Sequence, residues 1–567
     1  MKSKKTNLKI VLFLISLMVV SCQEMEMEKD LGVDDKLLWS NPGYINSYMV
    51  DLISMMPNGF SPDELGQGIF YANATDEAEN SNPSAQVQDF NTGNIDPTSE
   101  MVNQVWNKYY NGIYKVNLFL HKTDTLNLDH YVPEQRDLYL KSIEKYRSEA
   151  RFLRALFYYE LIKRFGGVVL LGDTYIAEYK DISQVSFTSA RSSFAECADY
   201  IINECDDLLD IGGLPLSEAE AQGRPNLIAI MTLKCKTLGF KASTSYNTAI
   251  QEGSTEQREI WTQVVVLAKE IVNMKPIILG PYNTYNGTGS EVILGYRLQY
   301  INFLERINYP IGCEGVYTTG STNPTQKLVD AFRMQNGMKI DEPGSGYDPE
   351  NPYQNRDSRL LLTVIPNGTQ WYERNVVPRE IEVFAGGRDG MDRYCGTRTG
   401  YYLRKYINPS LDLRQNYGEN RVWPIFRYAD VHLLWAEGLN ELFGPQETGG
   451  TGNSATAILN RLITQSAGLP RLNSSDYTQE SMRERIREES FIELAFENHR
   501  AWNLRRWGIA TEVLNSPVYR MKVTKDADGY IHYEKEKLEE RYFDERMMLY
   551  PIPQRAVNNG LEQNPYW

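Results

Sequence analysis

The chain has few of the residue patterns on which most enzymes depend. Its 567 residues include only five histidines, and none of these belongs to a His-Glu-x-x-His zinc motif. A Gly-x-Ser-x-Gly nucleophile turn, a phosphate-binding loop and a dinucleotide-binding fingerprint are also missing from the sequence. We therefore expect a protein that is not an enzyme and needs no cofactor. No metal site is legible, although the sequence leaves open whether calcium binds between loop carboxylates.

Cysteine is also scarce, and its spacing argues against both a disulfide framework and a cysteine-based metal site. After Cys22, no pair shows the spacing of a disulfide framework or of a Cys-x-x-Cys metal site. Cys197 and Cys205 lie eight residues apart on an expected helix, which separates them by roughly 12 Å, too far for a disulfide. We expect free, structural cysteines at the five remaining positions, which are Cys197, Cys205, Cys235, Cys313 and Cys395.

The chain also lacks an excess of positive charge. Its formal net charge is −15, which argues against nucleic acid as a ligand because the phosphates would be repelled. Tyrosine, by contrast, is abundant, with 37 residues. Tyrosine combines an apolar face with a polar tip, so this abundance fits a groove for a polar ligand. Any single tyrosine can equally be filler between helices.

The first 21 residues have the features of a targeting segment. Lysines precede an apolar run from Ile10 to Val20, which is too short to span a bilayer comfortably. Val19-Val20-Ser21-Cys22 resembles a bacterial lipobox, in which the cysteine becomes the lipidated first residue. We therefore expect residues 1–21 to be a lipoprotein signal peptide, Cys22 to carry the lipid, and residues 22–40 to form the tether. The alternative is an ordinary secretory signal with a nearby cysteine.

Helical periodicity dominates two parts of the chain. The segment from Tyr146 to Phe165 is apolar over so wide a face that it must be packed on two sides, as in a helical repeat array. Gly166-Gly167 predicts where this helix ends. We expect helical repeats over about 98–273 and 425–510, although no clean 34-residue period is present.

The region between these repeats has a different character. Residues 276–420 are rich in Gly, Pro, Asn and Tyr, and they show short apolar runs with little helical periodicity. We expect an irregular, loop-rich α+β insertion with small sheets, which carries most of the ligand face.

Several sequence blocks resemble the SusD/RagB family of outer-membrane nutrient-binding lipoproteins. The resemblance covers almost the whole chain, and its blocks occur in the family's order. Two departures are Arg487-Glu-Glu-Ser490, where the family usually has Arg-x-Glu-Arg, and Asn503, where Asp is common. Both departures look structural. Among the matching blocks are Trp106 to Asn117, Glu149-Ala-Arg-Phe-Leu-Arg-Ala155, Arg427-Tyr-Ala-Asp-Val431 and Glu493-Leu-Ala-Phe-Glu497.

This resemblance implies both a fold and a function. The fold is mainly α, a tetratricopeptide-like scaffold of helical hairpins with the irregular α+β insertion, in a single domain over residues 41–567. The function is the capture of oligosaccharides, less often peptides, at the cell surface of the outer membrane. Such proteins are non-catalytic lids on a SusC-like, TonB-dependent transporter, to which they pass the ligand.

Sugar binding requires flat aromatic rings together with carboxylates, amides and arginines that meet hydroxyl groups. Loops mounted on a rigid scaffold are the usual place for such groups. Asp76 and Glu77 match a Thr-Asp-Glu element near the family's ligand site. We expect ligand contacts from three loop stretches, with Asp76, Glu77, Tyr282, Tyr285, Tyr300, Tyr317, Trp371, Tyr372, Arg374 and Tyr394 as the candidate residues.

Three alternatives remain open from the sequence alone. The same architecture can bind a peptide or another nutrient instead of a glycan. A glycoside hydrolase, which needs two neighbouring carboxylates, is a second alternative. With 74 acidic residues some such pair is inevitable, so finding one is no evidence for or against hydrolysis. Helical repeats can also serve as a pure protein-interaction scaffold, although the long aromatic insertion disfavours this.

Overall fold

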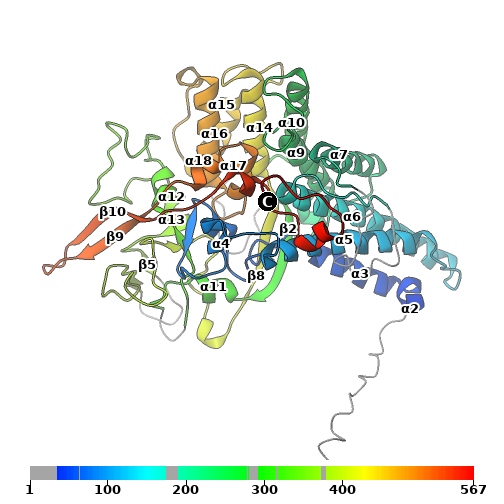
Figure 1. Ribbon diagram of the computed structural model, residues 1–567, viewed down its shortest axis with the longest axis horizontal. Helices are drawn as coiled ribbons and strands as arrows, with labels where there is room; N and C mark the ends of the chain where they lie inside the picture. The colour runs from blue at the N-terminus through cyan, green and yellow to red at the C-terminus, as the bar shows by residue number, and fades with distance from the viewer. Residues whose placement is uncertain are drawn as a thin grey trace, which may run out of the picture.

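A computed structural model describes residues 35–62, 64–173, 190–277, 279, 291–313, 317–371 and 378–567. The predicted signal peptide and the lipidation site at Cys22 lie outside these residues. The described chain is mainly helical with a few short sheets, which confirms the predicted fold class (Figure 1). No helix in the described ranges is long and apolar enough to cross a membrane.

Long helices pack against one another in a continuous series. Each helix in the series α5, α6, α7, α9, α10 and α14 contacts the next one. Helix α14 also contacts both α15 and α16. The contact between α10 and α14 joins the helices before the insertion to those after it. The long helices are α3 (Pro42–Ser54), α5 (Glu100–Asp124), α6 (Pro133–Phe165), α7 (Phe194–Ile211), α9 (Leu227–Lys241), α10 (Thr255–Met274), α14 (Tyr428–Phe443), α15 (Ala455–Leu462) and α16 (Gln479–Glu493).

Helix α6 is packed on two sides, as its sequence predicts. Phe152, Leu156 and Phe157 are fully buried, because α5 packs on one side of the helix and α7 on the other. The helix ends where Gly166 adopts a φ of 70°, and the Gly166 N–H donates to the carbonyl of Ile162. Glycine takes this left-handed conformation without the steric cost that a Cβ adds.

Short helices and turns connect the longer elements and build much of the insertion. Within the helical region predicted over 425–510, one helix ends at Glu493 and a separate short helix begins at Arg500. The short helical elements are α2 (Asp35–Ser40), η1 (Tyr71–Ala74), α4 (Gln88–Thr92), α8 (Glu218–Ala221), α11 (Phe303–Asn308), α12 (Gln326–Ala331), α13 (Leu360–Thr363), η3 (Leu413–Gln415), η4 (Ile463–Ala467), η5 (Ser474–Asp476), α17 (Arg500–Arg506), α18 (Ala510–Leu514), η6 (Glu545–Met548) and α19 (Gln554–Asn558).

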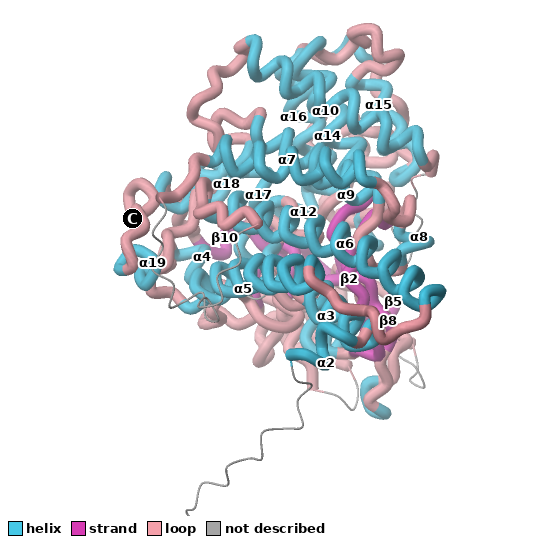
Figure 2. Tube along the Cα trace, turned by 90° about the vertical axis from the view of Figure 1, so that its right-hand side faces the viewer, coloured by secondary structure: helices cyan, strands magenta, loops and turns pink. Residues whose placement is uncertain are grey.

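The strands form five two-stranded antiparallel sheets, counted over the described part of the chain. The pairs are β1–β3, β2–β8, β4–β7, β5–β6 and β9–β10, and strands β2 and β8 lie inside the molecule next to the helices (Figure 2). The bounds are β1 (Ala78–Asn80), β2 (Val292–Ile301), β3 (Thr322–Pro324), β4 (Val364–Ile365), β5 (Gln370–Trp371), β6 (Arg379–Glu380), β7 (Tyr402–Leu403), β8 (Glu419–Arg427), β9 (Val518–Lys525) and β10 (Ile531–Glu539).

Two strand assignments differ from the sequence-based expectation. Ile425 to Arg427, which we expected at the start of a helix, close strand β8, and helix α14 begins only at Tyr428. The hairpin of β9 and β10 was not anticipated, and it projects from the body at the left of Figure 1. In β10 most side chains are charged and few are buried, so the alternation that marks a half-buried strand is weak.

Candidate ligand-binding site

Two of the predicted tyrosines, Tyr317 and Tyr394, form an exposed aromatic pair, which we call the tyrosine platform. The Tyr317 side chain is 69% exposed and that of Tyr394 is 84% exposed. The Tyr317 hydroxyl lies 3.9 Å from the sulfur of Cys395. Cys395, and to a smaller extent Tyr394, raises the pKa of the Tyr317 hydroxyl.

A buried carboxylate holds the two segments of the platform together. Asp389 is fully buried and accepts two hydrogen bonds from Arg379, at 2.6 and 2.9 Å. It also accepts the backbone N–H of Gly312, at 3.0 Å, from the segment that leads to Tyr317. A Cβ at position 312 would lie 2.5 Å from this carboxylate, so the close approach requires glycine. The platform therefore rests on a fixed polar anchor.

Tyr300 presents a further exposed ring at the end of β2. It is 79% exposed and adopts a φ of 51°, which is unusual for a residue with a side chain. Its backbone N–H donates to the Asn420 side chain, and a Cβ at Gly418 would lie 2.1 Å from its carbonyl oxygen. Strained backbone of this kind concentrates at functional sites. Tyr300 therefore stays a candidate ligand contact.

The structure corrects the predicted roles of Asp76 and Glu77. Asp76 is 7% exposed, and its two oxygens already accept hydrogen bonds from Arg500, at 2.9 and 2.8 Å. Burial by itself raises the pKa of Asp76, but Arg500 and Lys327 outweigh it and hold that pKa well below its usual range. Glu77 is 1% exposed, and burial raises its pKa to about 8. Both carboxylates serve the fold, because their polar atoms face the protein.

Trp371 is also corrected from a ligand contact to a core residue. It is 2% exposed, and its ring packs edge-on against Tyr309 with a centroid distance of 5.3 Å. A ring enclosed in this way has no free face for a sugar. Four other candidates, Tyr282, Tyr285, Tyr372 and Arg374, lie outside the described residues.

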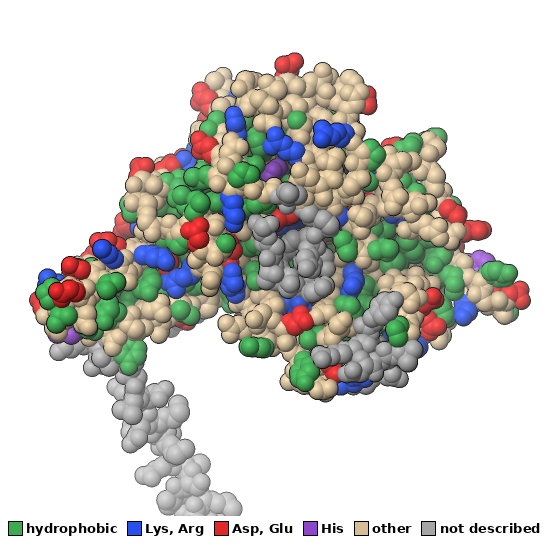
Figure 3. Space-filling model, turned by 180° about the vertical axis from the view of Figure 1, so that it is seen from behind, with side chains coloured by type: hydrophobic (Ala, Val, Ile, Leu, Met, Phe, Trp, Pro, Cys, Tyr) green, Lys and Arg blue, Asp and Glu red, His purple; other side chains and the backbone are tan. Residues whose placement is uncertain are grey.

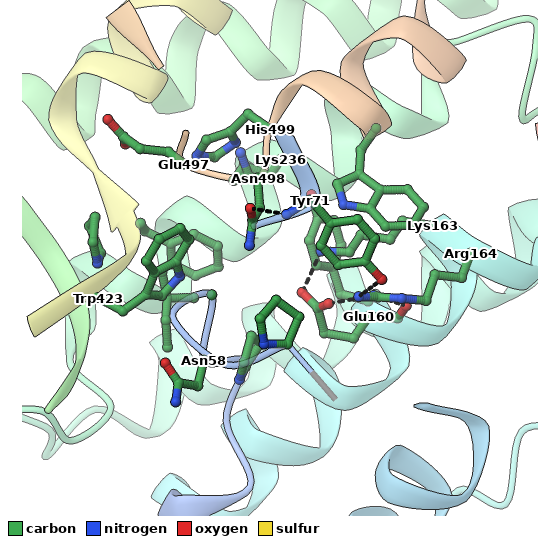
Figure 4. Close-up of a pocket in the computed structure, with 18 of the residues that line it drawn as sticks. Asn58, Tyr71, Glu160, Lys163, Arg164, Lys236, Trp423, Glu497, Asn498 and His499 are labelled. Atoms are coloured by element: carbon green, nitrogen blue, oxygen red, sulfur yellow. Dashed lines mark hydrogen bonds and ion pairs between the residues drawn. The ribbon is translucent and has the colours of Figure 1, made fainter. Parts of the chain in front are cut away.

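A pocket between the helices and strand β8, partly open to solvent, was not predicted from the sequence. We call it the interior cavity, and its volume is about 80 Å³. It is lined by the loop at Asn58, helix α6, helix α9, strand β8 and the turn before α17. In Figure 4, Trp423 and Tyr71 lie on opposite sides of it, and Glu160 and Asn58 lie below.

The charged groups of the interior cavity are already paired. Glu160 accepts from Lys163 and from Arg164, both at 2.6 Å, and Lys236 forms an ion pair with Asp430. Burial lowers the pKa of Lys163 to about 8, against the opposing effect of Glu160. Burial likewise lowers the pKa of His499 to about 4, so its imidazole is neutral at pH 7.

A strained turn supplies one wall of the interior cavity. Phe496 and Asn498 have φ values of 61° and 60°. The Asn498 side-chain oxygen accepts the backbone N–H of Tyr71 at 3.1 Å, and Glu77 accepts the N–H of Phe496 at 3.1 Å. The sequence signal for this turn was weak, because Glu493 to Glu497 continues an apolar helical pattern. Only asparagine at 498, a residue that tolerates the left-handed region, hinted at a break.

Other features of the described chain carry less information about function. All five cysteines after Cys22 are free, as predicted. Within the described ranges, no group of three or more His, Cys, Asp or Glu side chains could hold a metal ion. On the face shown in Figure 3, Lys and Arg side chains are interspersed with acidic ones.

Comparison with known proteins gives consistent matches along most of the chain. Residues 302–567 match the family described as "SusD family", and residues 46–232 match "Starch-binding associating with outer membrane". A SusD-like protein, P38, of Formosa agariphila is 24% identical over 525 residues, which are 89% of this chain and 92% of that protein.

Solved structures show the same fold. A SusD-like protein from Bacteroides fragilis superposes with a TM-score of 0.75 at 23% identity, covering 94% of this chain and 98% of that one. A SusD-like carbohydrate-binding protein from the same species has a TM-score of 0.71 at 21% identity, covering 92% and 99%. The two matched sequence regions, the relative of similar length and the shared fold agree, and the chain belongs to the SusD family.

Proposed function

We propose that this protein is a cell-surface glycan-binding protein that captures oligosaccharides on the tyrosine platform. The observation that carries the proposal is the exposure of Tyr317 and Tyr394 beside a buried polar anchor. Large exposed aromatic groups mark binding surfaces more often than chance, because water solvates their faces poorly. Asp389 restrains the chain segments behind the rings, so little conformational freedom is lost when a sugar ring stacks on them.

Polar groups around the platform suit a ligand with many hydroxyls. Arg388, Asp392 and Arg393 are exposed in the loop that carries Tyr394. The Arg393 guanidinium donates to the carbonyl of Arg388 and keeps further N–H groups available. A carboxylate and two guanidinium groups can satisfy hydroxyls at the edges of a stacked sugar. The named carbohydrate-binding neighbour from Bacteroides fragilis supports the same ligand class.

The finer parts of the proposal concern the membrane. Cys22 is the proposed lipid attachment site, which anchors the protein to the outer membrane at the cell surface. The captured oligosaccharide then passes to a SusC-like, TonB-dependent transporter, on which this protein acts as a lid without catalysing a reaction. Support comes from the matched description "associating with outer membrane" and from the lipobox-like sequence before Cys22.

The test measures glycan binding by the protein without its signal and lipidated cysteine. Affinity electrophoresis or calorimetry against a panel of polysaccharides and oligosaccharides is expected to reveal binding to one glycan class. The double variant Tyr317→Ala/Tyr394→Ala is expected to lose most of that binding. Tyr530→Ala is the matched control, because Tyr530 is 70% exposed at the tip of the β9–β10 hairpin.

Other outcomes discriminate among the alternatives. Binding that survives in the double variant would move the site away from the platform, with Tyr300 as the next position to change. Folded protein that binds peptides and no glycan would replace the ligand class. New reducing ends released from a bound glycan would show a hydrolase and would overturn the non-catalytic proposal.

A further inference from the structure

The interior cavity contains binding groups that the tyrosine platform leaves unexplained. The side-chain nitrogen of Asn498 has no hydrogen-bond partner among the described residues, while its oxygen is used by Tyr71. Figure 4 shows the Asn498 side chain directed into the space between Trp423 and Tyr71. The indole N–H of Trp423 also lacks a partner within the described chain, although this residue is only 3% exposed. Both donors open into the pocket, where a ligand can take the place of the water that otherwise binds them.

Acceptors lie across the cavity from these donors. The Glu160 carboxylate faces the space and accepts hydrogen bonds from Lys163 and Arg164. An ionised carboxylate has about four lone-pair sites, so two remain for a ligand. A ligand that both donates and accepts hydrogen bonds satisfies the two sides together. Hydroxyl groups have this property.

The pairing of charges favours a neutral ligand. Lys163 and Arg164 neutralise Glu160, and Lys236 neutralises Asp430. Glu497 is in turn paired with Arg427 at 2.7 Å and with Lys405 at 2.6 Å. A charged ligand would find no unpaired opposite charge in such a site. The free-energy cost of removing its charge from water would then not be compensated.

The walls and the size of the interior cavity further restrict the class of ligand that fits. Trp423 and Tyr71 offer aromatic surface on opposite sides, which suits the apolar faces of a ring. A volume of about 80 Å³ accommodates several water molecules or part of one small ring, so no more than one sugar unit enters and the rest of a ligand stays outside.

We propose that the interior cavity binds a single neutral sugar ring, at a site separate from the tyrosine platform. Asn498 and Trp423 donate to its oxygens, and Glu160 accepts from its hydroxyls. The strained turn at Phe496 and Asn498 holds the amide in place, since both of its ends are fastened to the segment that contains Tyr71 and Glu77. The sugar is either a free monosaccharide or the end unit of a captured chain.

The test compares matched variants in calorimetry and ligand-observed NMR. The probes are glucose, galactose, mannose, xylose and arabinose, their methyl glycosides, and galacturonate as the charged counterpart of galactose. Asn498→Asp keeps the acceptor for Tyr71 and removes the amide donor, and it is expected to weaken monosaccharide binding about tenfold. Asn416→Asp is the control, because Asn416 also has a left-handed backbone, with φ at 57°, and lies outside the cavity.

A second variant guards against misfolding of the first. Trp423→Phe keeps an aromatic wall and removes only the indole N–H with part of the ring, and it is also expected to weaken monosaccharide binding. The platform variant Tyr317→Ala/Tyr394→Ala is expected to bind the monosaccharide as the unchanged protein does. If this platform variant loses oligosaccharide binding but keeps monosaccharide binding, the two proposed sites are separate.

Three results would overturn the interior site. One is the absence of binding to every monosaccharide in the panel at millimolar concentration, which leaves the cavity to water. Another is binding that neither Asn498→Asp nor Trp423→Phe changes. The third is tighter binding of galacturonate than of galactose, which would show a site for anions. Binding of the free sugars but not of their methyl glycosides would identify the free monosaccharide as the ligand, whereas binding of both would fit the end unit of a chain.

Discussion

The tyrosine platform and the interior cavity differ in what holds their side chains. The rings of Tyr317 and Tyr394 stand in solvent, and only the chain behind them is fixed, through Asp389. In the interior cavity, the charged side chains Glu160, Lys236 and Glu497 are each fixed by ion pairs. The platform can therefore adapt to a long and variable ligand, whereas the cavity is preorganised for a small one.

This difference predicts that a change in the frame of the cavity costs far more than a change near the platform. Arg427 is 1% exposed and pairs with Glu497, Glu493 and Glu291, at 2.7, 2.9 and 3.1 Å. Arg427→Met leaves these buried carboxylates uncompensated and is expected to lower the free energy of unfolding by about 3–5 kcal/mol. Denaturant unfolding measures this loss.

The control for that change lies on the surface. Arg520 forms an ion pair with Glu536 on the β9–β10 hairpin, where both side chains are about a third exposed. Arg520→Met is expected to cost less than about 1 kcal/mol, because solvent screens an exposed pair. If Arg427→Met and Arg520→Met lowered the free energy of unfolding equally, buried ion pairs would contribute no more to stability than exposed ones, contrary to this prediction.

The protonation of Glu77, which contacts the strained turn of the interior cavity, offers a pH-dependent test of the stability of this region. Burial raises the pKa of Glu77 from 4.5 to about 8. Its contribution to stability is therefore fully present below pH 4.5 and is lost as the pH rises through about 8. Glu77→Gln resembles the protonated form, so the variant is expected to lose less stability than the unchanged protein between pH 5 and 9.

Thermal or denaturant unfolding at several pH values measures this difference. The expected change is on the order of a few kcal/mol across the range. Parallel pH profiles for the two proteins would show that Glu77 does not titrate in the folded state over this interval.

A more modest effect on stability than that of Arg427→Met concerns the platform anchor. Gly312→Ala places a Cβ 2.5 Å from an Asp389 oxygen, so Gly312 and the Asp389 side chain must move apart. We expect a loss of about 1–3 kcal/mol in the free energy of unfolding. Oligosaccharide binding should weaken, while monosaccharide binding in the cavity stays unchanged. Weakening of both would show that the two regions are coupled.

Much of the helical scaffold could be predicted from local sequence. Helix α6 shows this, because its apolar residues surround the helix and glycine follows its last turn. The end of β8 could not be predicted, because Ile425 to Arg427 is a short apolar run that fits a buried strand and a helix start equally well. The pairing of β8 with β2, more than a hundred residues earlier in the chain, decides in favour of the strand.

The candidate sites divide in a similar way. Aromatic residues in the insertion pointed to a ligand surface, and Tyr317 and Tyr394 are indeed exposed there. The sequence could not distinguish them from Trp371, because all three lie in loop-like stretches. Trp371 is removed from solvent by tertiary contacts, among them Tyr309 and Arg404. The interior cavity escaped prediction because its groups come from distant segments, such as Asn58, Lys163, Trp423 and Asn498.

By itself, the sequence determined the helices of the scaffold, the irregular insertion and the family resemblance. These depend on periodicity, glycine positions and local blocks, which are properties of neighbouring residues. Only the tertiary structure decided which aromatic rings are exposed, which carboxylates are paired and where an interior cavity forms. Burial and ion pairing depend on contacts between residues far apart in the chain, such as Asp76 with Arg500, and no local pattern records such contacts.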